Sequence, residues 1–140
     1  MNREVLFRAK SIEPSTEGKW VFGSLTMDCH GNCCICHPLK VPMVGGFQYF
    51  NVDTKTVGQL WMQIVNLKIF EGDVFEFPKH NVRFVVKYNE KRHQFCIAHP
   101  DELGLKYFNP WQCPDESWIE EFMKDAVLIG NIHDNPELLK

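Results

Sequence analysis

Four of the six cysteines and two of the six histidines lie in one nine-residue segment, Cys29–His37. Within it, Cys33 and Cys36 have the C-x-x-C spacing that lets two thiolates bind one tetrahedral Zn²⁺. We predict that Cys29 and His37 complete the four ligands of a structural zinc site. Zinc would also order this segment, because the free energy of metal binding becomes free energy of folding.

The same segment has other interpretations. His30 and Cys34 are substitute ligands, and Cys96 with His99, or Cys113, are a second source of ligands if the fold brings them close. A redox role is disfavoured because no βαβ pattern surrounds the C-x-x-C. The interpretation without chemistry is a loop of reduced thiols, since the sequence gives no sign of a secreted, disulfide-bonded protein.

Composition and motifs exclude several classes of protein. The chain has 140 residues, a net charge of −3 and 44% apolar residues, enough to build a core. No apolar run approaches the ~20 residues of a membrane span, and the charged first residues are unlike a signal peptide, so we expect a cytoplasmic protein. No nucleophile–base constellation, nucleophile elbow or phosphate-binding loop is visible, so we expect no enzyme and no catalytic residues.

Short apolar runs separated by turn-forming residues predict a mainly β protein. Strands are expected at residues 4–9, 19–26, 47–52, 56–61, 73–77, 82–88, 93–98 and 126–132. The first two form an N-terminal hairpin. Residues 28–46, rich in Cys, His, Pro and Gly, are expected to be irregular. One helix is expected near residues 115–126, where an apolar stripe recurs at helical spacing.

The predicted domain organisation has two parts. Residues 1–46 form the hairpin and the Cys/His-rich loop region, and residues 47–140 form a small β-barrel that includes the helix. The alternation of side chains predicts one shared core for eight residues. These are Phe75, Phe77, Phe84, Val86, Phe95, Ile97, Val127 and Ile129.

One predicted hairpin, with its loop at residues 89–92, has a composition that fits nucleic acid. Basic and aromatic side chains gather there: Lys87, Tyr88, Lys91, Arg92, His93 and Phe95. Small β-barrels stack bases on aromatic side chains beside such charges. The alternative is a solvated loop whose charges protect the strand edges, and the net charge of −3 favours it.

Four stretches, in order along the chain, resemble the YopX family of small phage and prophage proteins. The first is 3–9 with 19–25, similar to the family's I-x-F-R-A and W-V-Y-G-x-L. The others are 52–59 (similar to V-D-P-E-T-V-G-Q), 69–74 (similar to I-Y-E-G-D-I-V) and 129–139 (similar to I-G-N-I-Y-D/E-N-P-E-L-L). The chain departs from the family in residues 60–68, which lack its Gly- and Asp-rich turn, in the cysteines of 29–37, and in 109–126.

The resemblance implies a mainly β protein with an SH3-like barrel in its C-terminal half and an extended N-terminal region involved in association. It implies a bacterial host cell and brings no established activity or catalytic residues. We therefore expect a phage or prophage accessory protein that binds itself or a phage or host protein. The alternatives are a nucleic-acid-binding barrel and a zinc-stabilised interaction module. A homo-oligomer with contacts in residues 1–27 is expected, because an isolated hairpin is marginal in water.

Overall fold

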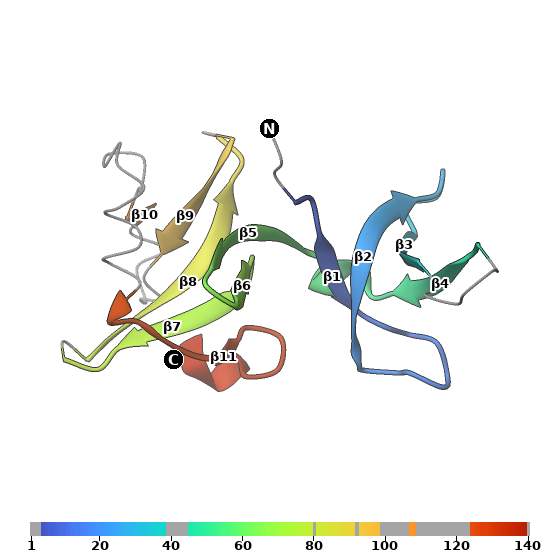
Figure 1. The fold of residues 1–140 in the computed structure, drawn as a ribbon. Coiled ribbons are helices and arrows are strands. Elements are labelled where there is room, and N and C mark those ends of the chain that lie inside the picture. Colours follow the sequence, from blue (N-terminus) through green and yellow to red (C-terminus); the bar gives the residue numbers. More distant parts are fainter. Residues whose placement is uncertain are drawn as a thin grey trace. The chain divides into compact units, whose positions relative to one another are not determined.

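The computed structural model describes residues 4–38, 45–79, 81–91, 93–98, 107–108 and 124–139. It confirms the mainly β fold, with antiparallel strands and short 3-10 turns (Figure 1). The chain divides into two compact units, unit 1 (Met1–Leu60) and unit 2 (Trp61–Lys140). Strand β5 (Gly58–Ile64) runs across this division, with its first residues in unit 1 and the others in unit 2.

Unit 1 contains four complete strands and the start of β5. The strands are β1 (Phe7–Lys10), β2 (Trp20–Met27), β3 (Cys33–Pro38) and β4 (Phe47–Val52). Their order in the sheet is β4-β3-β2-β1-β5, and every pairing is antiparallel. The N-terminal hairpin of β1 and β2 is thus confirmed, but it is part of a larger sheet.

The sheet of unit 1 curls until the end of β4 meets the residues that follow β1. Ser11, just after β1, forms an isolated β-bridge with Val52 at the end of β4. The Ile12 N–H donates to the Asn51 carbonyl, and the Asp53 N–H donates to the Lys10 carbonyl, both at 2.9 Å. A curled sheet buries one of its faces without a second layer, so unit 1 can form a core from so few strands.

The 3-10 turn η1 (Thr54–Thr56) fastens this closure. Asp53 caps the turn, because its side chain accepts a hydrogen bond from the Lys55 N–H at 3.0 Å. The Thr56 hydroxyl donates to the Asp53 carbonyl at 2.7 Å and accepts from the Lys10 N–H at 2.8 Å. The stretch that resembles V-D-P-E-T-V-G-Q is therefore a turn that joins β4 to β5 and ties both to β1.

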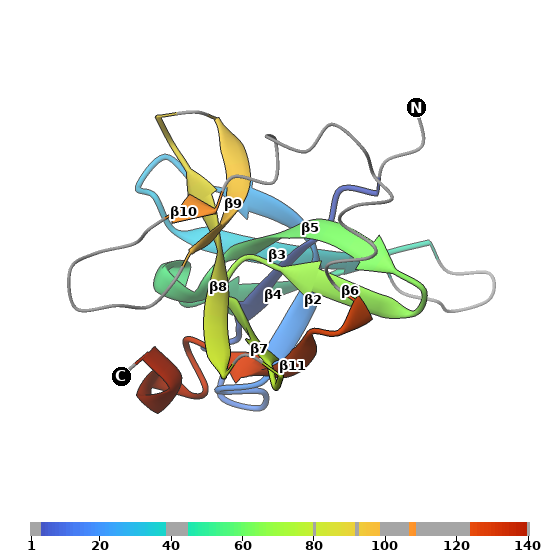
Figure 2. The same cartoon turned by 90° about the vertical axis from the view of Figure 1, so that its left-hand side faces the viewer.

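Unit 2 is built on a second antiparallel sheet, with order β10-β9-β8-β7-β11 (Figure 2). Its strands are β7 (Asp73–Phe77), β8 (Val82–Asn89), β9 (Gln94–Ala98), β10 (Tyr107–Phe108) and β11 (Val127–Asn131). Strand β6 (Leu67–Phe70) lies beside β5, and the two are joined by a turn at Val65 and Asn66. The chain ends in the 3-10 turn η3 (Pro136–Leu139).

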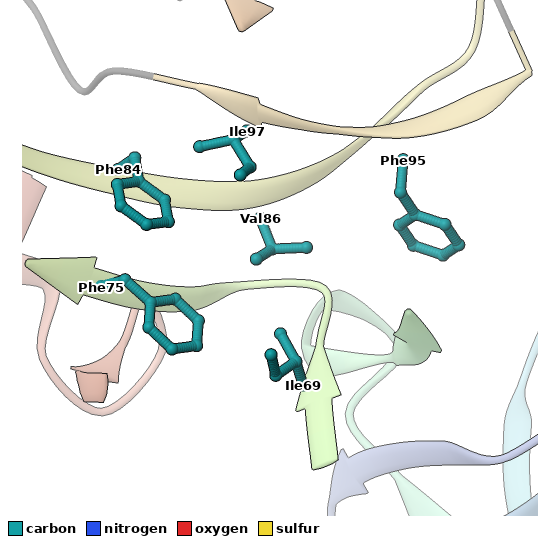
Figure 3. Close-up of a cluster of buried hydrophobic side chains, with 6 residues drawn as sticks. All are labelled: Ile69, Phe75, Phe84, Val86, Phe95 and Ile97. Atoms are coloured by element: carbon teal, nitrogen blue, oxygen red, sulfur yellow. The ribbon is translucent and has the colours of Figure 1, made fainter. Parts of the chain in front are cut away.

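Aromatic and β-branched side chains on one face of β7, β8 and β9 form the core of unit 2 (Figure 3). Phe84 is 1% exposed and stacks on Phe75, with ring centroids 5.6 Å apart. Phe77 lies 5.1 Å from Phe84, measured between the same ring centres. The buried members of the cluster are Ile69, Phe75, Phe84, Val86, Phe95 and Ile97.

Five of the eight predicted core residues belong to this buried cluster, and Phe77 packs against it. The prediction for β11 was wrong at Val127, which is 49% exposed. Ile129 is half-buried and is not a member of the cluster. The pairing of β11 with β7 shifts between Leu128 and Gly130, and such a bulge changes which side chains face the core.

The predicted boundary after residue 46 differs from the observed division after Leu60, because β4 pairs with β3 along its whole length and belongs to unit 1.

The expectation that residues 28–46 are irregular was wrong for Cys33–Pro38, which form strand β3 between β2 and β4. The helix predicted over 115–126 lies almost wholly outside the described residues. Of the described residues in that range, Lys124 is helical whereas Asp125 and Ala126 are not, and the 3-10 turn η3 follows later in the chain.

The turn between β6 and β7 is closed by a buried carboxylate. The Asp73 side chain accepts a hydrogen bond from the Phe70 N–H at 2.8 Å, and Asp73 is 3% exposed. Gly72 between them has a φ of +92°, which glycine adopts at little cost. Its N–H donates to the Val86 carbonyl and its carbonyl accepts from the Ile132 N–H, so this turn also connects β8 with the segment after β11.

Phe84 is the central residue of the unit 2 core, so its truncation should be costly. We expect Phe84→Ala to lower the free energy of unfolding by about 3–5 kcal/mol, since it leaves a cavity beside two aromatic rings. Val127→Ala is the control, with an expected change within about 0.5 kcal/mol because Val127 is exposed. Urea denaturation measures both. Equal losses would contradict the proposed core.

Gly130 lies against the side chain of Asn135, and a Cβ at this position would overlap Asn135 Oδ1. We expect Gly130→Ala to cost about 1–3 kcal/mol of stability, because the Asn135 side chain must move. Gly45→Ala is the matched control, since no atom lies within 4 Å of the position that its Cβ would take. Thermal unfolding of both variants is the measurement, and a neutral Gly130→Ala would show that the C-terminal turn adapts freely.

Candidate functional site

Strand β3 separates Cys33 from Cys36, which were predicted to bind one zinc ion. Side chains alternate between the two faces of a strand, so Cys33 and Cys36 point to opposite sides of the sheet. Cys33 is 3% exposed and belongs to the core of unit 1 with Ile35. Cys36 lies on the other face with Cys34, and both are half-buried. A C-x-x-C knuckle needs a bend that this extended segment does not have.

The other two predicted ligands also lie apart from a common centre. Cys29 is exposed in the turn between β2 and β3. The His37 ring lies at the end of β3, with its Nδ1 3.2 Å from the Phe22 carbonyl. Among the described residues, no group of three or more His, Cys, Asp or Glu side chains is placed to hold a metal ion. His99 and Cys113 lie outside the described residues.

The face of the β2-β3-β4 sheet opposite the unit 1 core is rich in aromatic side chains. The register places Ser24, Cys36 and Tyr49 in one row across the three strands, and Thr26, Cys34 and Asn51 in the next. Phe22 and Phe47 share this face, because each lies two residues before a member of the first row. We call this surface, with Phe22, Phe47 and Tyr49 as its aromatic members, the aromatic face.

Three exposed rings dominate the aromatic face. Phe22 is 42% exposed, Phe47 62% and Tyr49 59%. None of the side chains named in its two rows, nor Phe22 or Phe47, is acidic or basic at neutral pH. Aromatic enrichment and depletion of charge are the composition found at the centres of protein interfaces.

Two polar members of this face, Tyr49 and Cys34, have raised pKa values. The Tyr49 hydroxyl hydrogen-bonds the Cys36 side chain, which raises the pKa of Tyr49 above its ordinary value. Burial raises the pKa of the Cys34 thiol, and the nearby Glu13 carboxylate adds to this effect. The Cys34 thiol also lies 3.7 Å from Asn51 Oδ1, to which it donates. Tyr49 and Cys34 are therefore both protonated at pH 7.

Positive charge lies on the side of this face nearest β1. The Arg8 guanidinium lies 4.6 Å from the centroid of the Trp20 ring, and the Lys10 ammonium lies 5.5 Å from it. Arg8 is only 8% exposed, so its cation–π contact is largely removed from water. These contacts fix the half-buried Trp20 at the margin of the face.

Unit 1 also contains a cleft of about 310 Å³ between the loops that follow β1 and β2. Two carboxylates line it, and both have structural partners. Glu13 Oε1 accepts from the main-chain and side-chain nitrogens of Asn51, at 3.0 and 2.7 Å. Asp28 accepts hydrogen bonds from the Asn32 side chain, from the Asn32 N–H and from the His30 N–H, and these lower the pKa of Asp28. The carboxylates therefore organise the loops around the cleft.

In the described part of the β8–β9 hairpin, the two rings pack on each other, and Lys87 lies on the opposite face of β8 from Tyr88. Phe95 is 7% exposed in the unit 2 core, with Tyr88 packed edge-on against it at 5.2 Å. Lys87 and Tyr88 are successive residues of β8, so they point to opposite faces. Lys91 and His93 are exposed at the turn, and Arg92 lies outside the described residues.

The aromatic face was not predicted from the sequence, because no strand was expected at residues 33–38. The signal was present in Phe47-Gln48-Tyr49, an aromatic run without charge, and in the alternation of Cys33 and Ile35 with Cys34 and Cys36. Recognising the face from sequence required knowing that β3 pairs with both β2 and β4.

None of the helical segments in the described residues has the length and apolar character needed to span a bilayer.

Comparison with known proteins gives one match. The family model described as YopX protein matches residues 64–140, which is more than half of the chain and includes most of unit 2. No curated protein and no solved structure matches this chain. The matched part contains two of the stretches noted in the sequence, at 69–74 and 129–139, which form the Asp73 turn and the segment from β11 to η3. The chain belongs to the YopX family.

Proposed function

We propose that this protein is a non-catalytic binding protein, encoded by a phage or prophage and active in the bacterial cytoplasm, that works through protein–protein contacts and first of all through self-association. The observation that carries the proposal is the aromatic face, where three exposed rings lie on one sheet surface to which β2, β3 and β4 contribute no charged side chain. Apolar surface of this kind is seldom left open to water unless it receives a partner.

The location of the contact surface in this proposal differs from the one expected from sequence. The apolar side chains Phe7, Val21 and Leu25 of the N-terminal hairpin pack into the core of unit 1. The hairpin therefore covers these apolar side chains within its own unit and does not need a second chain to do so. The surface left for a partner is therefore built jointly by β2, β3 and β4, and a truncation of residues 1–27 would remove two strands of the sheet.

The SH3-like barrel expected in residues 47–140 is, in our proposal, better assigned to unit 1. Small barrels of that type have five antiparallel strands with a 3-10 turn before the last strand. The order β4-β3-β2-β1-β5, the turn η1 between β4 and β5, and the Ser11–Val52 bridge support this assignment. Nucleic-acid binding and zinc stabilisation, which the sequence suggested, remain the alternatives. No arrangement of side chains among the described residues supports either of them.

Self-association can be tested with a variant of one exposed ring. We expect the full chain to associate at micromolar concentrations, and Phe22→Ser to raise the dissociation constant about tenfold or more, as truncation of a central aromatic does in other interfaces. Sedimentation velocity over a concentration series measures this, with thermal unfolding of each protein to confirm that it is folded.

Val65→Ser is the matched control for this experiment. Val65 is an exposed apolar residue of unit 2, 84% exposed at the turn after β5, and lies outside the aromatic face. Its substitution should leave the dissociation constant unchanged. A full chain that stays monomeric throughout the concentration series would overturn the self-association proposal, and equal effects of the two variants would remove the aromatic face from it.

A further inference from the structure

Strand β4 is the last strand of its sheet, and part of its outer edge has no partner among the described residues. Near its end, both main-chain groups of Asn51 are used on the outer side. The Asn51 N–H donates to Glu13 Oε1 at 3.0 Å, and its carbonyl accepts from the Ile12 N–H at 2.9 Å. The described residues provide no such partners for Phe47 and Tyr49.

The alternation of the backbone determines which groups of β4 point outward. In an antiparallel pair, the N–H and C=O of one residue point to the same side, and the next residue points to the other. Since Asn51 points outward, Tyr49 and Phe47 also point outward, whereas Gln48 and Phe50 point to β3. The free edge therefore offers the donors and acceptors of Phe47 and Tyr49.

The residues of β4 lack the devices that keep edge strands of monomeric proteins apart. Such strands usually carry lysine or other charges, proline or a bulge. The strand Phe47–Val52 has three aromatic residues and no charge or proline. Gly45 and Gly46, which precede it, add no charge. This composition favours pairing with another strand.

We propose that β4 pairs antiparallel with β4 of a second copy of this chain, which rests on the self-association proposed above and specifies its geometry. Because Asn51 is already engaged, the register that uses only free groups centres the two-fold axis on Gln48. Phe47 then exchanges both main-chain hydrogen bonds with the partner's Tyr49, and the symmetry repeats this pair.

The second copy is the occupant that this edge fits best, because the edge is complementary to itself. In the proposed register, each Phe47 ring lies beside the partner's Tyr49 ring, and aromatic cross-strand pairs stabilise a sheet. No charge on β4 selects a basic or acidic peptide. The paired strands join two aromatic faces into one continuous surface, which buries part of their exposed rings.

A comparison of Tyr49→Pro with Tyr49→Ala separates the contribution of main-chain pairing to association from the contribution of side-chain contact. Tyr49→Pro removes an outward N–H, which an edge strand tolerates, whereas Tyr49→Ala keeps it and loses the same ring. We expect Tyr49→Ala to weaken association moderately, and Tyr49→Pro to weaken it about tenfold further, measured by sedimentation velocity with thermal unfolding as the check of folding. Equal dissociation constants for the two folded variants would overturn the edge pairing.

Amide hydrogen exchange of the unmodified full chain gives an independent readout, which holds if Tyr49→Pro fails to fold. The amides of Phe47 and Tyr49 should become protected as protein concentration rises, whereas those of Gln48 and Phe50 should be protected at every concentration. Association without concentration-dependent protection of Phe47 and Tyr49 would overturn the edge pairing and leave the proposed function standing. Absence of any association would overturn both the edge pairing and the proposed self-association.

Discussion

The pairing of β3 with both of its neighbours is the constraint on which unit 1 depends. Cys33–Pro38 bonds to β2 on one side and β4 on the other, so the strand is fully extended. Extension sends Cys33 and Ile35 into the core and Cys34 and Cys36 to the opposite face. The same alternation that builds the core therefore keeps Cys33 and Cys36 from sharing one metal ion, and it lines up the aromatic face that we propose for association.

Carboxylate and amide side chains hold the turns between the strands. Asp53 caps η1, Asp73 receives the Phe70 N–H, and Asn131 Oδ1 receives the N–H groups of His133 and Asp134. All three lie in stretches that resemble the YopX family. Their roles in this chain are structural, since each satisfies main-chain donors that a turn leaves without strand partners. The stretches that resemble the family thus account for how the chain turns, whereas the proposed association rests on the surface of unit 1.

The aromatic face and the edge of β4 reinforce one another physically. Edge pairing alone exchanges main-chain hydrogen bonds with water for hydrogen bonds with a partner, which yields little net free energy. Exposed rings alone bury apolar area but do not define a register. In the proposed dimer, the outward main-chain groups of Phe47 and Tyr49 would align the strands, and their side chains would provide the buried apolar area. A polar edge or a charged face would lack one of the two.

The sequence by itself determined the β class, most strands, the turns and the family, because these depend on local alternation and on turn-forming residues. It also identified most of the unit 2 core, where strands such as β8 carry large side chains at every second position. Only the tertiary structure decided which residues of the Cys33–Cys36 segment are buried, that Val127 is exposed beyond a bulge, and that β4 belongs with β3. The physical reason is that alternation shows which side chains share a face, whereas pairing between distant strands decides which face is covered.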